Sequence, residues 1–207
     1  MKIKLLLPVL MIFSSLLVFA QGDNLKDVLA VANAGYKDCL EKIPNGQEVS
    51  WGFNNRDEFT IAKVGKPYQT VTLNKGFFND TILSENNYLV FNDEWRVPIM
   101  VNGEYRTLLR VIRIKGKWEV TGLGANVLAK ELGKFENEHP SVKQYGMILR
   151  VYQMVSDFIL LPIDNSSSIM NIYPLASAKT ALSEKENGKT FYSLSEALLL
   201  IKQHIKH

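Results

Sequence analysis

The chain has 207 residues, of which 46% are apolar and 22% are charged, so it can bury a core and is not a low-complexity disordered protein. The formal net charge is +3, but Lys2 and Lys4 account for two of these charges, and the chain beyond residue 20 carries only +1. This near-balance gives no support for binding to nucleic acid or to an anionic membrane surface.

The first twenty residues have the pattern of a secretory signal peptide. Lys2 and Lys4 precede a largely apolar run from Leu5 to Phe19, and Ala20 is a small residue before the expected cut. We therefore expect residues 1–20 to be removed, the mature protein to begin at Gln21, and the protein to be periplasmic or secreted. The run is shorter than the ~20 residues of a spanning helix, so we expect no membrane span after processing.

Cys39 is the single cysteine, so no intramolecular disulfide can form. It lies on an apolar stripe of helical spacing that includes Tyr36 and Leu40. We expect a buried thiol that does not react in the folded protein, with a reactive or intermolecular thiol as the alternative.

Residues 21–139 are predicted to form a first lobe made of helices and an antiparallel sheet. The expected elements are a helix over 24–42, a short helix over 56–64, a strand over 68–73, a loop over 74–87, a meander over 95–123 and a helix over 126–138.

The meander is the strongest structural signal in the chain. Asn102-Gly103 and Lys115-Gly116 separate β-rich runs and favour tight turns with positive φ. Pro98 lacks an N–H group for the ladder, so the first strand is expected at an edge, at least along that side.

Residues 140–207 are predicted to form a second lobe. The alternative is that they continue the first lobe as part of one domain. The expected elements are strands over 146–154, 157–163 and 169–173, a turn over 164–168, a short helix over 174–182, a charged loop over 183–189 and a helix over 194–206. The fold class is α+β, an antiparallel β-meander packed against helices in one domain or two small lobes.

Counting outward from the two turns gives a register for the meander. It pairs Met100 with Tyr105, Trp95 with Arg110, and Val120 with Val111. One face then carries Met100, Tyr105, Leu109, Val111, Trp118 and Val120 and suits a core.

The other face of the meander mixes aromatic and guanidinium groups. We predict that Trp95, Arg106 and Arg110 form a binding patch, because such groups are typical interface anchors. The alternative is that helices of the second lobe cover this face while the arginine stems pack flat.

No cofactor, metal site or catalytic residue is predicted. The glycines of 122–127 lack the third glycine and the βαβ context of a dinucleotide loop. His139, His204 and His207 do not have the spacing of a metal site.

The segment 47–52, Gln-Glu-Val-Ser-Trp-Gly, resembles the Q-x-V-x-G loop of cystatins, with one residue inserted before the glycine. The resemblance covers six residues and implies a wedge that blocks peptidases.

Three functions are therefore considered. The favoured one is an exported, non-catalytic binding or accessory module with a protein or peptide partner, and the sequence does not indicate an oligomeric state or favour an enzyme. The alternatives are a secreted hydrolase-like enzyme in which acids and His139 converge, and a cystatin-like peptidase inhibitor.

Overall fold

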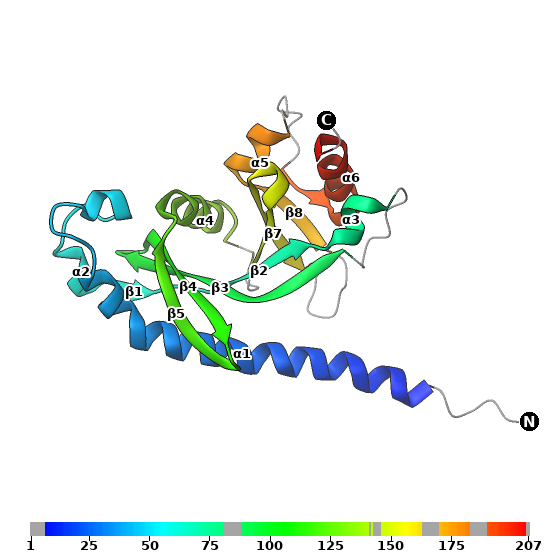
Figure 1. Cartoon of the computed structure of the whole chain (residues 1–207), viewed down its shortest axis with the longest axis horizontal. Coiled ribbons are helices and arrows are strands. Elements are labelled where there is room, and N and C mark those ends of the chain that lie inside the picture. Colours follow the sequence, from blue (N-terminus) through cyan, green and yellow to red (C-terminus); the bar gives the residue numbers. More distant parts are fainter. Residues whose placement is uncertain are drawn as a thin grey trace, which may run out of the picture.

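The computed structural model describes the backbone of residues 7–80, 88–140, 142, 146–162, 170–182 and 190–205, and side chains from residue 24 onward. It confirms the α+β class: a nine-stranded, mostly antiparallel sheet packs against helices (Figure 1). The strand order is β5-β4-β3-β2-β6-β7-β8-β9, and β1 pairs with β3.

The strands are β1 (Lys63–Val64), β2 (Tyr68–Leu73), β3 (Leu89–Val101), β4 (Glu104–Ile114), β5 (Lys117–Gly124), β6 (Met147–Val151), β7 (Ser156–Pro162), β8 (Met170–Pro174) and β9 (Tyr192–Ser193). The helices are α1 (Leu7–Glu41), η1 (Glu48–Trp51), α2 (Glu58–Ile61), α3 (Lys75–Asn79), α4 (Asn126–Glu138), η2 (Tyr152–Met154), α5 (Ala176–Ala181) and α6 (Leu194–Ile205).

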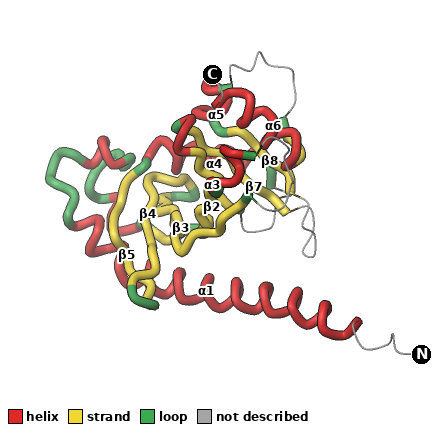
Figure 2. The backbone as a smooth tube through the Cα atoms, turned by 45° about the vertical axis from the view of Figure 1, so that its right-hand side comes forward, coloured by secondary structure: helices red, strands yellow, loops and turns green. Residues whose placement is uncertain are grey.

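The first helix, α1, is longer than the helix expected over 24–42, because it begins at Leu7 and runs through the expected cleavage site. Its C-terminal part packs against β5, β4 and β1, whereas its N-terminal part extends away from the rest of the chain (Figure 1, Figure 2). Within the described residues, no helix is long and apolar enough to cross a membrane.

The helix expected over 56–64 is wrong in extent. Only Glu58–Ile61 is helical, and Lys63–Val64 is a strand that pairs with Met100 and Ile99 of β3. The loop expected over 74–87 also contains a short helix, α3, where the Asn74 side chain accepts a hydrogen bond from the Phe77 N–H group at 3.1 Å. Pairing with β3 therefore determines the strand conformation of Lys63–Val64, and the Asn74 cap stabilises α3.

Both turns of the meander are confirmed. Asn102 and Gly103 have φ values of 52° and 84°, and Lys115 and Gly116 have 49° and 82°. Positive φ at both central residues is the geometry of the type I′ turn, whose twist matches that of the flanking strands.

The edge position expected for the first meander strand is wrong, because β3 lies between β4 and β2. The carbonyl oxygen of Pro98 accepts a hydrogen bond from the Gly65 N–H group at 2.7 Å. Gly65 lies in the interval between β1 and β2, so the missing N–H group of Pro98 faces a break in the neighbouring ladder.

The register is correct near the turns and wrong farther from them. Met100 pairs with Tyr105 and Val120 with Val111 as predicted, but Trp95 pairs with Val111 instead of Arg110. An irregularity between Ile99 and Met100 inserts one extra residue into β4. A bulge of this kind moves every later side chain by one position, so the two predicted faces were mixed.

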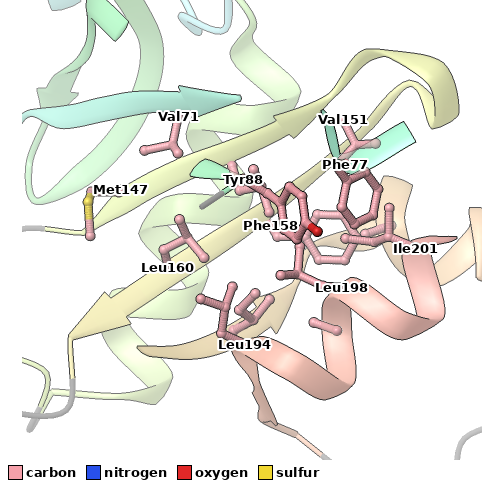
Figure 3. Close-up of a cluster of buried hydrophobic side chains, with 14 of the residues drawn as sticks. Val71, Phe77, Tyr88, Met147, Val151, Phe158, Leu160, Leu194, Leu198 and Ile201 are labelled. Atoms are coloured by element: carbon pink, nitrogen blue, oxygen red, sulfur yellow. The ribbon is translucent and has the colours of Figure 1, made fainter. Parts of the chain in front are cut away.

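The sheet has two covered faces. On one, α1 packs over β3, β4 and β5 in a cluster that includes Val28, Val97 and Val111, which we call the α1 cluster. The same face continues toward β8, where α6 and α3 cover Val71, Phe158 and Leu160 (Figure 3).

The opposite face is covered by α4. Ala129, Leu132 and Phe135 of this helix pack with Tyr68, Tyr105, Leu108, Ile148 and Ile159 of the sheet, which we call the α4 cluster. One 13-residue helix does not cover the whole face, and the part beside it carries the charged residues described below.

The sheet continues across the boundary suggested at Pro140, because β6 pairs in parallel with β2. The last helix begins with a capping box: the Glu196 N–H group donates to the Ser193 hydroxyl and the Glu196 carboxylate accepts from the Ser193 N–H group. The turn expected over 164–168 and the loop over 183–189 lie outside the described residues.

Candidate functional site

Trp95, the first predicted contact residue, lies inside the α1 cluster. Trp95 is only 4% exposed. Helix α1 covers it, whereas the alternative given above expected helices of the second lobe to do so. Within the described part of the chain, the buried indole Nε1 has no hydrogen-bond partner. Trp95 therefore contributes packing at this position.

Arg106, the second predicted contact residue, lies at the bulge of β4 and is also buried, at 9% exposure. Its guanidinium group pairs with Glu58 at 2.8 Å and with Glu104 at 2.6 Å. Burial raises the pKa of Glu58, but hydrogen bonds from Asn54 and the charge of Arg106 outweigh it and leave that pKa below its usual range. Arg106 thus joins β4 to α2.

Arg110, the third predicted contact residue, is exposed, with 47% of its side chain accessible. It pairs with Arg96 across the β3–β4 ladder and therefore lies on the α4 side of the sheet, opposite to Trp95. The structure does not bring the three predicted residues together on one surface, and a binding role for all three stays a prediction.

The structure instead brings Arg110 together with other charged residues, which we call the charged cluster: Glu94, Arg96, Arg110, Arg150 and Asp157. Glu94 pairs with Arg96 at 2.7 Å and with Arg110 at 2.9 Å. On the neighbouring hairpin, Asp157 Oδ1 is 3.7 Å from Arg150 Nε.

Register places all of these residues on the α4 side of the sheet. Arg96 is opposite Tyr68, a member of the α4 cluster, and Arg150 and Asp157 are opposite each other one step beyond Ile148 and Ile159 of that cluster. The cluster therefore runs across β4, β3, β6 and β7 beside α4.

Two buried polar atoms at the charged cluster have no hydrogen-bond partner among the described residues. They are Asp157 Oδ1 and Thr70 Oγ1, and Thr70 is aligned with Ile148 on the same side of the sheet. Glu94 Oε1 also lacks a hydrogen bond, but its ion pair with Arg96 is short, at 2.7 Å, whereas the ion pair of Asp157 Oδ1 with Arg150 is 3.7 Å long. Unsatisfied buried acceptors of this kind are rare and suggest an absent partner.

Burial also affects the acids near the cluster. It raises the pKa of Asp157 above its usual range, although Arg150 and Arg96 act in the opposite direction. Burial likewise raises the pKa of Glu131 on α4, with the Ala176 N–H group opposing and the charge of Asp157 adding to the effect.

The rim of the charged cluster is aromatic. The Arg150 guanidinium lies 5.7 Å from the ring centroid of Tyr152, and Tyr152 is 62% exposed. Arginine and tyrosine are, with tryptophan, enriched at binding hot spots. The arrangement offers accessible donors on Arg110 and Arg150 beside two buried oxygen atoms, Asp157 Oδ1 and Thr70 Oγ1, that have no hydrogen bond among the described residues.

The residues of the hydrolase alternative do not converge on His139. Its ring lies among Phe135, Tyr173 and Phe191, with centroid separations of 4.8, 5.6 and 5.1 Å, and no carboxylate among the described residues hydrogen-bonds to it. In that same part of the chain no group of three potential metal-binding side chains occurs.

The cystatin-like segment forms the 3₁₀ helix η1, not a hairpin wedge. The Asn126 side chain donates to the Ser50 carbonyl at 3.2 Å and holds η1 near the start of α4. Val49 of this segment is 71% exposed.

Sequence reasoning missed the Arg150–Asp157 pair, although a signal was available. Each charge interrupts an otherwise apolar strand, β6 or β7, and a tight hairpin between them places the two residues opposite each other. Their position beside Arg96 could not be inferred, because it depends on the parallel pairing of β6 with β2.

No family model matches the chain, and comparisons with curated proteins and with solved structures find no significant match.

Proposed function

We propose that this protein is an exported, non-catalytic binding module whose charged cluster holds a polar segment of a protein or peptide. The observation that carries the proposal is the juxtaposition of two buried oxygen atoms, Asp157 Oδ1 and Thr70 Oγ1, with accessible guanidinium groups on Arg110 and Arg150. Neither oxygen atom has a hydrogen bond among the described residues, and the ion pair of Asp157 Oδ1 with Arg150 is long, at 3.7 Å. The leader-like residues 1–20 support export.

The chemistry of the cluster favours a ligand that has both donors and acceptors. Asp157 requires a donor such as an ammonium or amide group, the Thr70 hydroxyl can donate or accept, and Arg110 and Arg150 require a carboxylate or carbonyl oxygen. Peptides provide both kinds of group at short spacing. The ring of Tyr152 supplies apolar contact area at the rim.

The experiment is a selection of random peptides displayed on phage against the immobilised mature protein, followed by fluorescence polarisation with the selected peptides. Arg110→Ala is expected to weaken binding roughly 30-fold, the effect of losing a hot-spot arginine of about 2 kcal/mol. Arg113→Ala is the matched control, because Arg113 lies on the same strand and its position places it on the α1 side.

Binding that is unchanged by Arg110→Ala, or equally weakened by Arg113→Ala, would contradict the proposal. A selection that enriches no peptide would also contradict it. Arg150→Ala provides a second, independent variant, because Arg150 belongs to a different strand.

One observation favours the hydrolase alternative. Glu131 and Asp157 come from α4 and β7, and burial raises the pKa of both carboxyl groups, which favours the protonated form that a general acid needs. Hydrolysis of chromogenic peptide, ester or glycoside substrates that Asp157→Asn abolishes would establish this function, and activity unaffected by Asp157→Asn would exclude this pair as its source.

A further inference from the structure

A pocket of about 260 Å³ lies on the side of the sheet opposite to the charged cluster. Its walls come from three elements that are distant in sequence. The C-terminal end of α1 and the residues after it provide Cys39, Lys42 and Ile43, η1 provides Trp51, and β5 provides Thr121 and Leu123.

The shape of the pocket follows from a bulge in an edge strand. The β4–β5 register shifts after Arg110, which is opposite Gly122, whereas Val111 is opposite Val120 and Thr121 is left as the extra residue. Because β5 is at the end of the strand order, the bulge can bend it without disturbing another strand. The bulge thus accounts for the space between β5 and the end of α1.

The wall that η1 provides is fixed by a close contact between two backbone segments. Gly52 has a φ of 96°, and a Cβ atom there would lie 2.0 Å from the carbonyl oxygen of Arg106. Only glycine permits this contact, which holds η1 and therefore Trp51 against β4. The pocket is thus formed before any ligand arrives.

The walls are mainly apolar, and Lys42 is the charged residue among those that line the pocket. Within the described residues, no ion pair joins Lys42 to a carboxylate. Burial raises the pKa of the Cys39 thiol, and the charge of Asp38 on the same helix adds to this effect. Asp38 does not line the pocket. The pocket is open to solvent on one side, and an apolar ligand is favoured there because it removes the apolar walls from water.

We propose that this pocket binds a small apolar molecule with one anionic group, such as a medium-chain carboxylate whose chain contacts Trp51 and Leu123 and whose carboxylate faces Lys42. The volume corresponds to roughly nine water molecules of liquid at ~30 Å³ each, which suits a ligand of about ten heavy atoms. This site lies on the opposite side of the sheet from the charged cluster and does not depend on the function proposed above.

The single cysteine of the chain provides the readout. The sequence predicts a buried Cys39 that does not react in the folded protein, but the structure shows it only partly buried and among the residues that line the pocket. The uncharged reagent N-ethylmaleimide is allowed to modify the folded mature protein, and mass spectrometry follows the rate with and without octanoate. At a free concentration about ten times its dissociation constant, octanoate is expected to slow the modification of Cys39 about tenfold. Octylamine, which has the same chain and the opposite charge, is expected to protect much less.

Two variants and one control variant test the assignment of the walls. Lys42→Glu is expected to weaken protection by octanoate about tenfold and to strengthen protection by octylamine. Lys37→Glu makes the same charge change on α1, at an exposed position that does not line the pocket, and it should leave protection unchanged. Thr121→Trp should reduce protection by both molecules, because it fills space at the bulge.

Isothermal titration calorimetry with octanoate gives a measurement that does not depend on the thiol. No heat of binding and no protection up to millimolar octanoate would overturn the proposal. Equal loss in Lys42→Glu and Lys37→Glu would overturn the role of Lys42, because it would show a general charge effect. Binding that Thr121→Trp does not alter would place octanoate outside this pocket.

Discussion

Arg96 and Arg110 lie directly opposite each other on β3 and β4, and the carboxylate of Glu94 pairs with both, at 2.7 and 2.9 Å. Like charges directly opposite each other on paired strands destabilise the pairing, and the carboxylate of Glu94 offsets this repulsion. The side chain of Glu94 is only 13% exposed, which strengthens its effect on both arginines.

Glu94→Gln is therefore expected to lower the free energy of unfolding by about 2 kcal/mol, less than the full effect of a buried pair because Arg110 is accessible to solvent. Urea unfolding measures this change. Asp93→Asn, an exposed neighbour on the same strand, should change the free energy of unfolding by less than about 0.5 kcal/mol. Equal effects of the two substitutions would show that the ion pairs contribute nothing specific.

Trp95→Ala is expected to lower the free energy of unfolding by about 3–5 kcal/mol, because it leaves a cavity beneath α1. Trp95→Phe should have a much smaller effect, since the indole N–H group that it removes has no hydrogen-bond partner among the described residues. Thermal unfolding followed by circular dichroism compares the two. A Trp95→Ala protein as stable as the parent would show that α1 does not pack on this residue.

Thr70→Val and Thr107→Val form a matched pair, because both threonines are buried in the sheet. The Thr107 hydroxyl donates to the Gly124 carbonyl at 3.0 Å, whereas Thr70 Oγ1 has no partner among the described residues. Thr107→Val should lower the free energy of unfolding by about 1–2 kcal/mol, and Thr70→Val should leave it unchanged or raise it. Chemical denaturation distinguishes the two, and a Thr70→Val protein that is clearly less stable would reveal an unseen partner.

The pH dependence of stability should reveal Asp157. Because burial raises its pKa in the folded state, the unfolded chain releases this proton more readily, and stability falls as pH rises from the unfolded pKa, about 3.9, through the folded one. Asp157→Asn removes this loss, so its melting temperature should exceed that of the parent at pH 7 and approach it near pH 3. A constant difference across this range would contradict the raised pKa.

The leader is expected to be removed from the exported protein. Mass spectrometry of material from the periplasm or medium should find Gln21 as the first residue. Removal should leave the melting temperature unchanged, because the packed part of α1 includes Leu25, Val28 and Ala32, all beyond the cut. An intact Met1, or a large fall in stability after removal, would contradict this expectation.

The sequence determined those features that local chemistry controls. The dipeptides Asn102-Gly103 and Lys115-Gly116 favour positive φ at both positions and define two tight turns. The capping box of Ser193 and Glu196 defines the start of α6. The strand over 68–73 and the helix over 126–138 were found at the observed bounds, since each shows a regular hydrophobic period.

Tertiary structure decided the sides of the sheet and therefore the site. The bulge in β4 moved Trp95 beneath α1 and left Arg110 on the opposite side, a change that a count from the turns does not reveal. Pro98 lies inside the sheet because β1 and β2 leave a gap opposite it. The charged cluster exists because β6 pairs with β2 about 80 residues away, and the energy of such nonlocal pairing is not encoded in any single segment.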